Sequence, residues 1–145
     1  MVVGHAGFIK SVEDIYEAMI NSAPSVRFGV AFTEASGPCL VRGEGNDPKM
    51  EALAKKNAMA IGAGHTFVVL FIGAYPINVI NAIKSVVEVS VVFCATSNPT
   101  EVLVAQTGLG KAVVGVVDGN SPKGIEGEGE KAERKIFLRK TGYKL

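Results

Sequence analysis

Two features of the sequence predict a three-layer α/β/α fold with a mixed β-sheet, formed by a single domain over residues 1–145. Helix-like and strand-like segments alternate in the middle of the chain, whereas the later strands follow one another through short turns. This order favours a mixed sheet over a purely parallel one. The run 67–72 is apolar on both faces, as in a central strand that is covered on both sides. A chain of 145 residues also fits one hydrophobic core, which is why we expect one domain.

The first half of the chain predicts two helices and two strands. Residues 11–22 place apolar side chains at i, i+3 and i+4, the spacing of a helix with one buried face. Residues 26–35 place apolar side chains at alternate positions, as in a strand, and residues 38–45 indicate a shorter strand after a turn. A second helix is expected over residues 46–64, because a polar capping residue stands before Pro48, which fits the first helical turn, and glycines end the segment.

The second half predicts one helix between strands and a basic helix at the end of the chain. The helix over residues 75–86 begins near a proline and carries isoleucines at helical spacing. The tail 126–145 passes from an acidic loop into a basic amphipathic helix, whose charges we expect to face solvent. Strands are predicted over residues 65–73, 87–97, 101–107 and 111–119.

The composition excludes several classes of function. The formal net charge is +1, from 15 basic and 14 acidic side chains, which argues against a general nucleic-acid-binding surface. No apolar run approaches the roughly 20 residues that a membrane-spanning helix needs, and the first ten residues lack the pattern of a signal peptide. We therefore expect a cytoplasmic protein, with Cys39 and Cys94 as free thiols. Because 48% of the residues are hydrophobic, more than a small interior accommodates, we also expect a homo-oligomer.

Polar residues flanked by glycine recur where the predicted strands end. If these ends lie at the same edge of the sheet, the polar residues converge on one pocket. Asn78 and Asn81 lie one turn apart at the start of the helix predicted over residues 75–86, where their amides either bind a base or a sugar, or cap and pack the helix. The candidate residues at the strand ends are Glu34, Ser36, Gly64, His65, Asn98, Asp118, Ser121 and Lys123.

The segment 118–124, DGNSPKG, is the richest in such residues. Asp118 can ligate magnesium, because hard cations prefer carboxylate oxygens. Lys123 can neutralise a phosphate group as a point charge. The alternative is an ordinary turn, because aspartate, glycine, asparagine, serine and proline all favour turns.

His65 stands between a glycine-rich turn and the apolar run of the central strand. An imidazole titrates near neutrality and can act as base, acid or nucleophile, and Gly62 and Gly64 allow a phosphate group to approach backbone amides. The alternative is a structural histidine whose ring bonds a backbone carbonyl group. The functional hypothesis requires that His65 and the turn from Asp118 to Lys123 face one another across a shared cavity.

Six short segments follow one another from residue 45 to residue 145: GNDP, GAGHTFVV, YPINVINAIK, VFCATSNP, VDGNSPKGIEGE and a terminal GYKL. Together they resemble the adenosine-specific kinase family. The resemblance implies an α/β subunit that assembles into a homo-oligomer, with a trimer favoured, and that binds adenosine and adenine nucleotides. It also implies phosphoryl transfer that involves a stably phosphorylated histidine.

The hypothesis is therefore a phosphotransferase that uses ATP with Mg²⁺. His65 lies in the matching GAGHTF segment and is the expected phosphoryl acceptor. Asp118 and Glu34 are the expected carboxylates for Mg²⁺, and Lys123 and the amide of Gly64 are expected to offset the charge on the transferred group. The other expected nucleotide contacts are Ser36, Asn78, Asn98 and Ser121.

The segment 4–10, GHAGFIK, departs from the family pattern, in which a histidine stands directly before Phe-Ile-Lys. Gly7 occupies that position here and His5 lies two residues earlier, so the phosphorylated residue is either His65 or His5. Two other classes of function are kept as hypotheses. One is a non-catalytic module that binds or senses adenine nucleotides, and the other is a scaffold whose polar loops are only turns.

Overall fold

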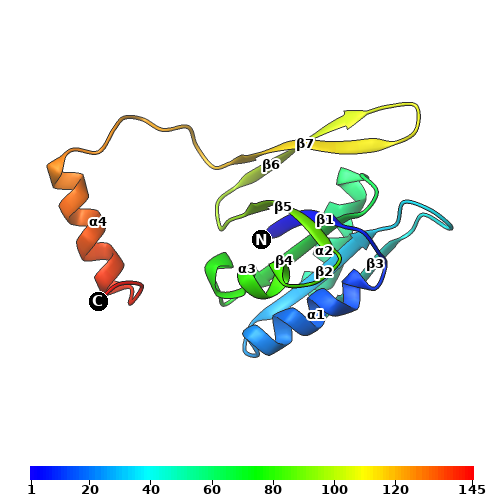
Figure 1. Ribbon diagram of the computed structural model, residues 1–145, viewed down its shortest axis with the longest axis horizontal. Helices are drawn as coiled ribbons and strands as arrows, with labels where there is room; N and C mark the ends of the chain where they lie inside the picture. The colour runs from blue at the N-terminus through cyan, green and yellow to red at the C-terminus, as the bar shows by residue number, and fades with distance from the viewer.

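A five-stranded sheet with the strand order β3-β2-β4-β1-β5 forms the centre of the protein, in a computed structural model that describes residues 1–145 (Figure 1). β4 is the middle strand and pairs with β2 and β1. It carries the apolar run that the sequence predicts to be central, and Phe67, Val68 and Val69 are all buried. The strands of this sheet are β1 (Val2–Ala6), β2 (Arg27–Thr33), β3 (Val41–Gly45), β4 (Thr66–Ile72) and β5 (Val89–Ala95).

Every pairing between neighbouring strands of this sheet is antiparallel. β4 and β5 are joined through a helix and run in the same direction, but β1 lies between them and runs opposite to both. The single parallel pairing in the protein is an isolated bridge between Ala63 and Lys111. The predicted α/β class is therefore confirmed. The parallel pairing that a mixed sheet would contain is limited to this bridge.

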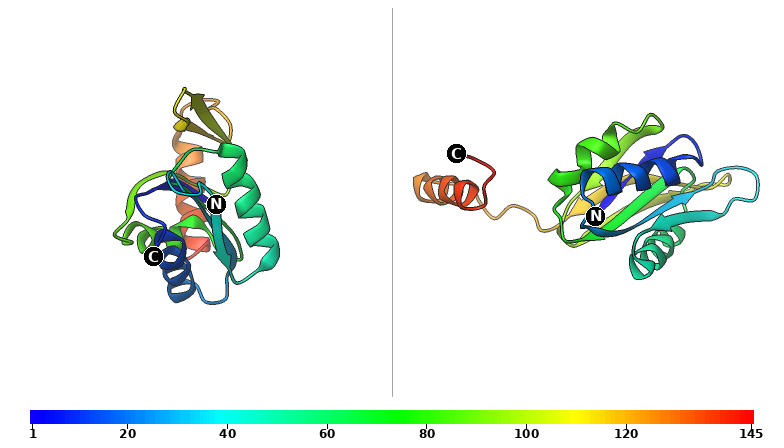
Figure 2. Two further views of the ribbon diagram at one scale, coloured as in Figure 1. Left: turned by 90° about the vertical axis from the view of Figure 1, so that its right-hand side faces the viewer. Right: turned by 90° about the horizontal axis from the view of Figure 1, so that it is seen from below.

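Helices cover both faces of the sheet and build a separate hydrophobic core on each (Figure 2). α1 (Ser11–Ser22) and α3 (Pro76–Lys84) pack on one face, where Met19 and Ile83 join the buried phenylalanines of β2 and β4. α2 (Pro48–Ile61) packs on the other face through small alanine side chains, which allow it to approach the sheet closely.

A hairpin of β6 (Thr100–Gln106) and β7 (Lys111–Asp118) forms a second, two-stranded sheet. Val102, Val113 and Val116 of this hairpin pack against the core on the α2 side of the central sheet. The hairpin and α2 therefore share that face, and they complete the third layer of the fold.

Local sequence signals placed the first two helices correctly. α1 has the bounds that its apolar spacing predicts, and α2 begins after Asp47, whose carboxylate accepts hydrogen bonds from the amides of Lys49 (2.9 Å) and Met50 (3.0 Å). The strand β1 was missed, because the sequence assigns no element before residue 11. A Cβ atom at Gly4 in this strand would lie 2.3 Å from the carbonyl oxygen of Val91, so the strand fits between its neighbours only without a side chain there.

The last helix, α4 (Glu128–Lys140), lies apart from the rest of the molecule at the end of the segment 119–127 (Figure 1). A helix is predicted in this tail and is confirmed, and none of its residues is buried. Neither α4 nor any other helix combines the length and the apolar character needed to cross a membrane.

Candidate functional site

The candidate residues fall into two groups at opposite ends of the five-stranded sheet. The end of β1 pairs with the start of β4, where His65 stands, and the start of β1 lies beside Thr96, whose amide donates to the carbonyl oxygen of Met1 (2.9 Å). Thr96 also bonds Asp118 (2.7 Å), so about one strand length, roughly 17 Å at about 3.3 Å per residue, separates Asp118 from His65. The expectation that His65 and the turn at Asp118 face one another across a shared cavity is therefore wrong for a single chain.

The two carboxylates predicted to share Mg²⁺ are divided in the same way. Glu34 follows β2 and lies at the His65 end, because the amide of His65 donates to the carbonyl oxygen of the preceding residue, Thr33 (2.7 Å). Asp118 lies at the other end. No three His, Cys, Asp or Glu side chains lie close enough together in the chain to hold a metal ion.

The backbone of His65 adopts a left-handed conformation (φ 58°), which is uncommon for a residue with a side chain. Two backbone hydrogen bonds hold it there: its amide donates to Thr33, and its carbonyl oxygen accepts from Ala6 (2.9 Å). Its ring stacks on Phe32 and meets the ring of His5 edge to face, with 5.7 Å between ring centroids in each case. The two histidines of the chain, which are 60 residues apart in the sequence, therefore form a pair.

A serine hydroxyl contacts the ring of His5. Ser90 Oγ lies 2.7 Å from His5 Nδ1 and 3.2 Å from the carbonyl oxygen of His5. The single hydroxyl proton serves either this carbonyl oxygen, with Nδ1 protonated, or Nδ1 itself, with the proton of the neutral ring on Nε2. Burial, and secondarily the neighbouring His65, lower the pKa of His5. Both effects favour the neutral imidazole.

A cavity of about 700 Å³ opens at the same end of the sheet, on the side of α2 and the β6–β7 hairpin, and neither histidine is among its lining residues. Its walls come from the loop after β2, the end of α2 and the tip of the β6–β7 hairpin, and Gly64 in its lining is the neighbour of His65 in the chain. Lys111 lines the cavity, forms no ion pair, and lies against Gly62, where an added Cβ would be 3.4 Å from the lysine Nζ. The cavity thus combines an unpaired cation with glycine backbone, which suits an anionic group.

The Glu34 carboxylate holds the loop that walls the cavity. It accepts hydrogen bonds from the amide of Leu40 (2.8 Å) and from Arg42 Nε (2.9 Å), and it forms an ion pair with Arg42 Nη2 (2.8 Å). These hydrogen bonds, that of Leu40 first, lower the pKa of Glu34. Ser36 and Cys39 are exposed in the same loop, and Cys39 also has a left-handed backbone (φ 52°). Glu34 therefore joins the start of the loop to its end and fixes the loop's conformation.

At the opposite end, Asp118 joins two turns. Its Oδ1 accepts from Thr96 Oγ1 (2.7 Å) and from Asn98 Nδ2 (3.0 Å), and these two bonds lower the pKa of Asp118. The next amide, of Gly119, donates to the carbonyl oxygen of Pro99 (2.9 Å). The predicted neighbours Asn98 and Asp118 are thus brought together, with their polar atoms bonded to each other.

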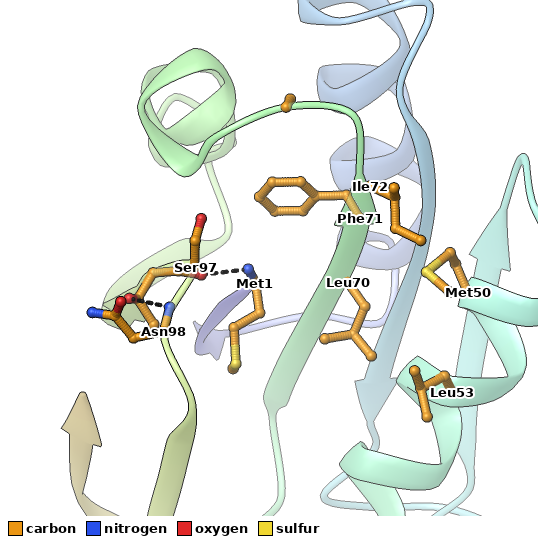
Figure 3. A pocket seen from close by; sticks show the side chains of 10 residues that line it. Met1, Met50, Leu53, Leu70, Phe71, Ile72, Ser97 and Asn98 are labelled. Carbon is orange, nitrogen blue, oxygen red and sulfur yellow. Dashed lines mark hydrogen bonds between the residues drawn. The ribbon is translucent and has the colours of Figure 1, made fainter. Parts of the chain in front are cut away.

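The cavity at this end has a volume of about 380 Å³ and is mostly apolar (Figure 3). Figure 3 shows Met1, Leu70 and Leu53 in its lining, with Ser97 and Asn98 on its polar side. The remaining candidate residues, Asn78, Ser121 and Lys123, do not line this cavity. Asn78 accepts a hydrogen bond from the amide of Tyr75 (3.0 Å) at the start of α3, and Ser121 and Lys123 are exposed in the segment 119–127.

Sequence analysis missed two residues of the His65 end, Lys111 and Ser90. A signal for Lys111 exists, because the sequence TGLGK puts a lysine directly after a glycine-rich tip, as in loops that approach phosphate groups. No local signal identifies Ser90, since it meets His5 only through the pairing of β1 with β5.

Comparison with known proteins supports one family over nearly the full length. The family model described as adenosine-specific kinase matches residues 1–144. Among solved structures, the crystal structure of the PH1918 protein from Pyrococcus horikoshii OT3 superposes with a TM-score of 0.95 at 47% sequence identity, over 99% of this chain and 89% of that one. No curated protein matches the chain. The chain belongs to the adenosine-specific kinase family.

Proposed function

We propose that this protein is a phosphotransferase that binds adenosine and ATP with Mg²⁺ at the His65 end of the sheet and passes a phosphoryl group through a histidine. The observation that carries the proposal is the 700 Å³ cavity that contains Lys111, at the end of the sheet where His5 and His65 form a pair. A cavity of this size fits a nucleoside with phosphates. Membership in a kinase family agrees with this activity.

In the first step, an imidazole Nε2 attacks the γ-phosphorus of ATP, a P–N bond forms, and the bond to the β,γ-bridging oxygen breaks to release ADP. Mg²⁺ bound to the nucleotide would offset charge on the phosphate oxygens. The Lys111 ammonium group in the cavity lining would offset negative charge on the phosphate groups of a bound nucleotide. In the second step, a hydroxyl oxygen of adenosine attacks phosphorus, the P–N bond breaks, and the released imidazole takes the hydroxyl proton.

Either histidine can serve as the acceptor in this scheme. The GAGHTF match favours His65, whereas the lowered pKa of His5 favours His5, because the neutral imidazole is the nucleophile. The second ring then lies within contact of the first and contributes to the shape and charge of its surroundings.

The test is incubation with ATP labelled on the γ-phosphate, followed by mapping of the modified residue. A phosphohistidine is lost in acid and survives alkali, which separates it from phosphoserine. We expect label on the intact protein and transfer of label to adenosine. Of the two variants, His5→Asn and His65→Asn, the one that lacks the acceptor is expected to lose the label. Retention of both label and turnover when both histidines are replaced would exclude the proposed route.

A second candidate function is binding of adenine nucleotides without turnover. It is favoured by one observation: the carboxylates expected to hold the metal, Glu34 and Asp118, are already engaged in hydrogen bonds within the chain. Calorimetric titration with adenosine, AMP, ADP and ATP, together with a turnover assay, separates the two functions. Affinity without product would support the binding module.

A further inference from the structure

The C-terminal arm, residues 119–145, makes few contacts with the rest of the chain. The side-chain hydrogen bonds and ion pairs formed by residues 120–145 stay within the arm, as in the pair Glu126–Arg134 (2.7 Å). Ile136 and Phe137 of α4 are 66% and 61% exposed. An isolated helix of this length is marginally stable in water, so we expect it to depend on a packing partner.

The chain exposes more surface than a compact monomer of its mass, because the arm stands away from the body. The chain exposes 9011 Å². A compact monomer of 15.2 kDa exposes about 7,100 Å² by the usual scaling of surface with mass. The difference, roughly 1,900 Å², exceeds the roughly 800 Å² that each partner buries in an interface of standard size.

An apolar groove of matching character lies between α2 and the β6–β7 hairpin. Two cavities, of about 380 and 260 Å³, share Met1 and Leu70 in their linings and therefore lie next to each other. Leu70 of β4 contributes to both, Leu53 of α2 lines the first (Figure 3), and Val102 of β6 lines the second. Most of the residues that line the first cavity are hydrophobic, and Leu53 among them is 43% exposed.

We propose that the arm of one copy docks its α4 into the α2–hairpin groove of a second copy. The segment 119–127 leads α4 away from its own body, and residues 120–125 form no hydrogen bond that would hold it back (Figure 1). Arm exchange brings two bodies together and so also covers apolar side chains such as Leu103 and Val114 on the hairpin, which a fold-back within one chain leaves exposed. This association does not depend on the proposed phosphoryl transfer.

The first test is the mass of the full chain in solution, by size-exclusion chromatography with light scattering. The wild type is expected above the monomer mass, whereas Phe137→Glu in the arm and Leu53→Glu in the groove are each expected to elute as monomers. Val87→Glu is the matched control, because Val87 is 94% exposed and belongs to neither surface. A monomeric wild type, or arm and groove variants that keep the mass of the control, would overturn the proposal.

The second test separates exchange from a fold-back of the arm, using Cys39→Ser chains so that the exposed native thiol does not react. Differently tagged Leu53→Cys and Phe137→Cys chains are mixed and oxidised. Exchange predicts a covalent species that carries both tags, and Val87→Cys mixed with Phe137→Cys predicts none. If the Leu53→Cys/Phe137→Cys double variant instead closes a disulfide within single chains and the mixture stays uncrosslinked, the arm covers its own groove and the proposal is wrong.

Discussion

At the scale of single residues, chemistry at the His65 end depends on which ring nitrogen is free. Ser90 Oγ lies 2.7 Å from Nδ1 of His5 and occupies that nitrogen, whereas Nε2 has no hydrogen-bond partner within the chain. The lowered pKa of His5 keeps that ring neutral to a lower pH than a free histidine. The same shift has a consequence for stability that is independent of any activity.

We predict that stability falls as the pH drops below about 6.5, and that His5 causes part of the fall. Because the folded-state pKa of His5 lies below its ordinary value of 6.5, the unfolded chain binds the proton more readily between the two values, so the free energy of unfolding rises with pH in this window. Urea unfolding of the wild type and of His5→Gln at pH 7.5 and pH 5 measures the effect. The variant is expected to lose less stability on acidification, and an equal loss in both proteins contradicts the assignment.

Lys111 is predicted to bind phosphate without supporting the fold. Lys111→Met removes the unpaired cation of the 700 Å³ cavity, and we expect about tenfold weaker binding of ATP, equivalent to ~1.4 kcal/mol, with adenosine binding unchanged. Lys56→Met on α2 is the control, because Lys56 is also exposed and forms no ion pair. Calorimetric titration with both ligands tests this prediction. Equal weakening of adenosine binding and ATP binding would mean that Lys111 contributes to the shape of the cavity and not to its charge.

At the scale of elements, the narrow passage of β1 between β4 and β5 depends on Gly4. A Cβ atom there would lie 2.3 Å from the Val91 carbonyl oxygen and 2.6 Å from the Phe67 ring. We predict that Gly4→Ala destabilises the protein by more than about 2 kcal/mol, as overpacked core positions do. Gly7→Ala, where nothing lies within 4 Å of the added atom, is expected to stay within ~0.5 kcal/mol. Denaturant midpoints compare the two, and similar values would mean that β1 shifts to make room.

The elements that the sequence predicts well are those with a local signal. Pro48 and Asp47 mark the start of α2, and the 3.6-residue period marks α1. Strand order is different, because β1 pairs with residues more than 60 positions away and its sequence VVGHA is too short to show a period. The alternation of strands and helices predicted some parallel pairing, and the insertion of β1 removed it.

The same distinction explains the outcome at the candidate site. Asn98 and Asp118 meet because they lie at the two ends of one hairpin, so the order of neighbouring strands along the chain is enough to bring them together. The distance between Asp118 and His65 depends on which ends of β1 and β4 they occupy, and sequence spacing carries no information on that. The pairing of His5 with His65 likewise follows from the register of β1 on β4, in which His5 lies opposite Thr66.

At the scale of the whole molecule, the proposed arm exchange would make stability depend on protein concentration. If the arm docks on a second copy, association stabilises only the folded state, so the unfolding midpoint rises with protein concentration. We predict such a rise for the wild type across a hundredfold dilution series, followed by circular dichroism, with Val87→Glu behaving alike. Phe137→Glu lacks the association and is expected to unfold at the same temperature throughout the series. Phe137 is 61% exposed in the single chain, so the substitution leaves the fold of that chain unchanged. A wild-type midpoint that does not move with concentration would mean that the central sheet and its two cores are stable alone, and that the arm contributes nothing to them.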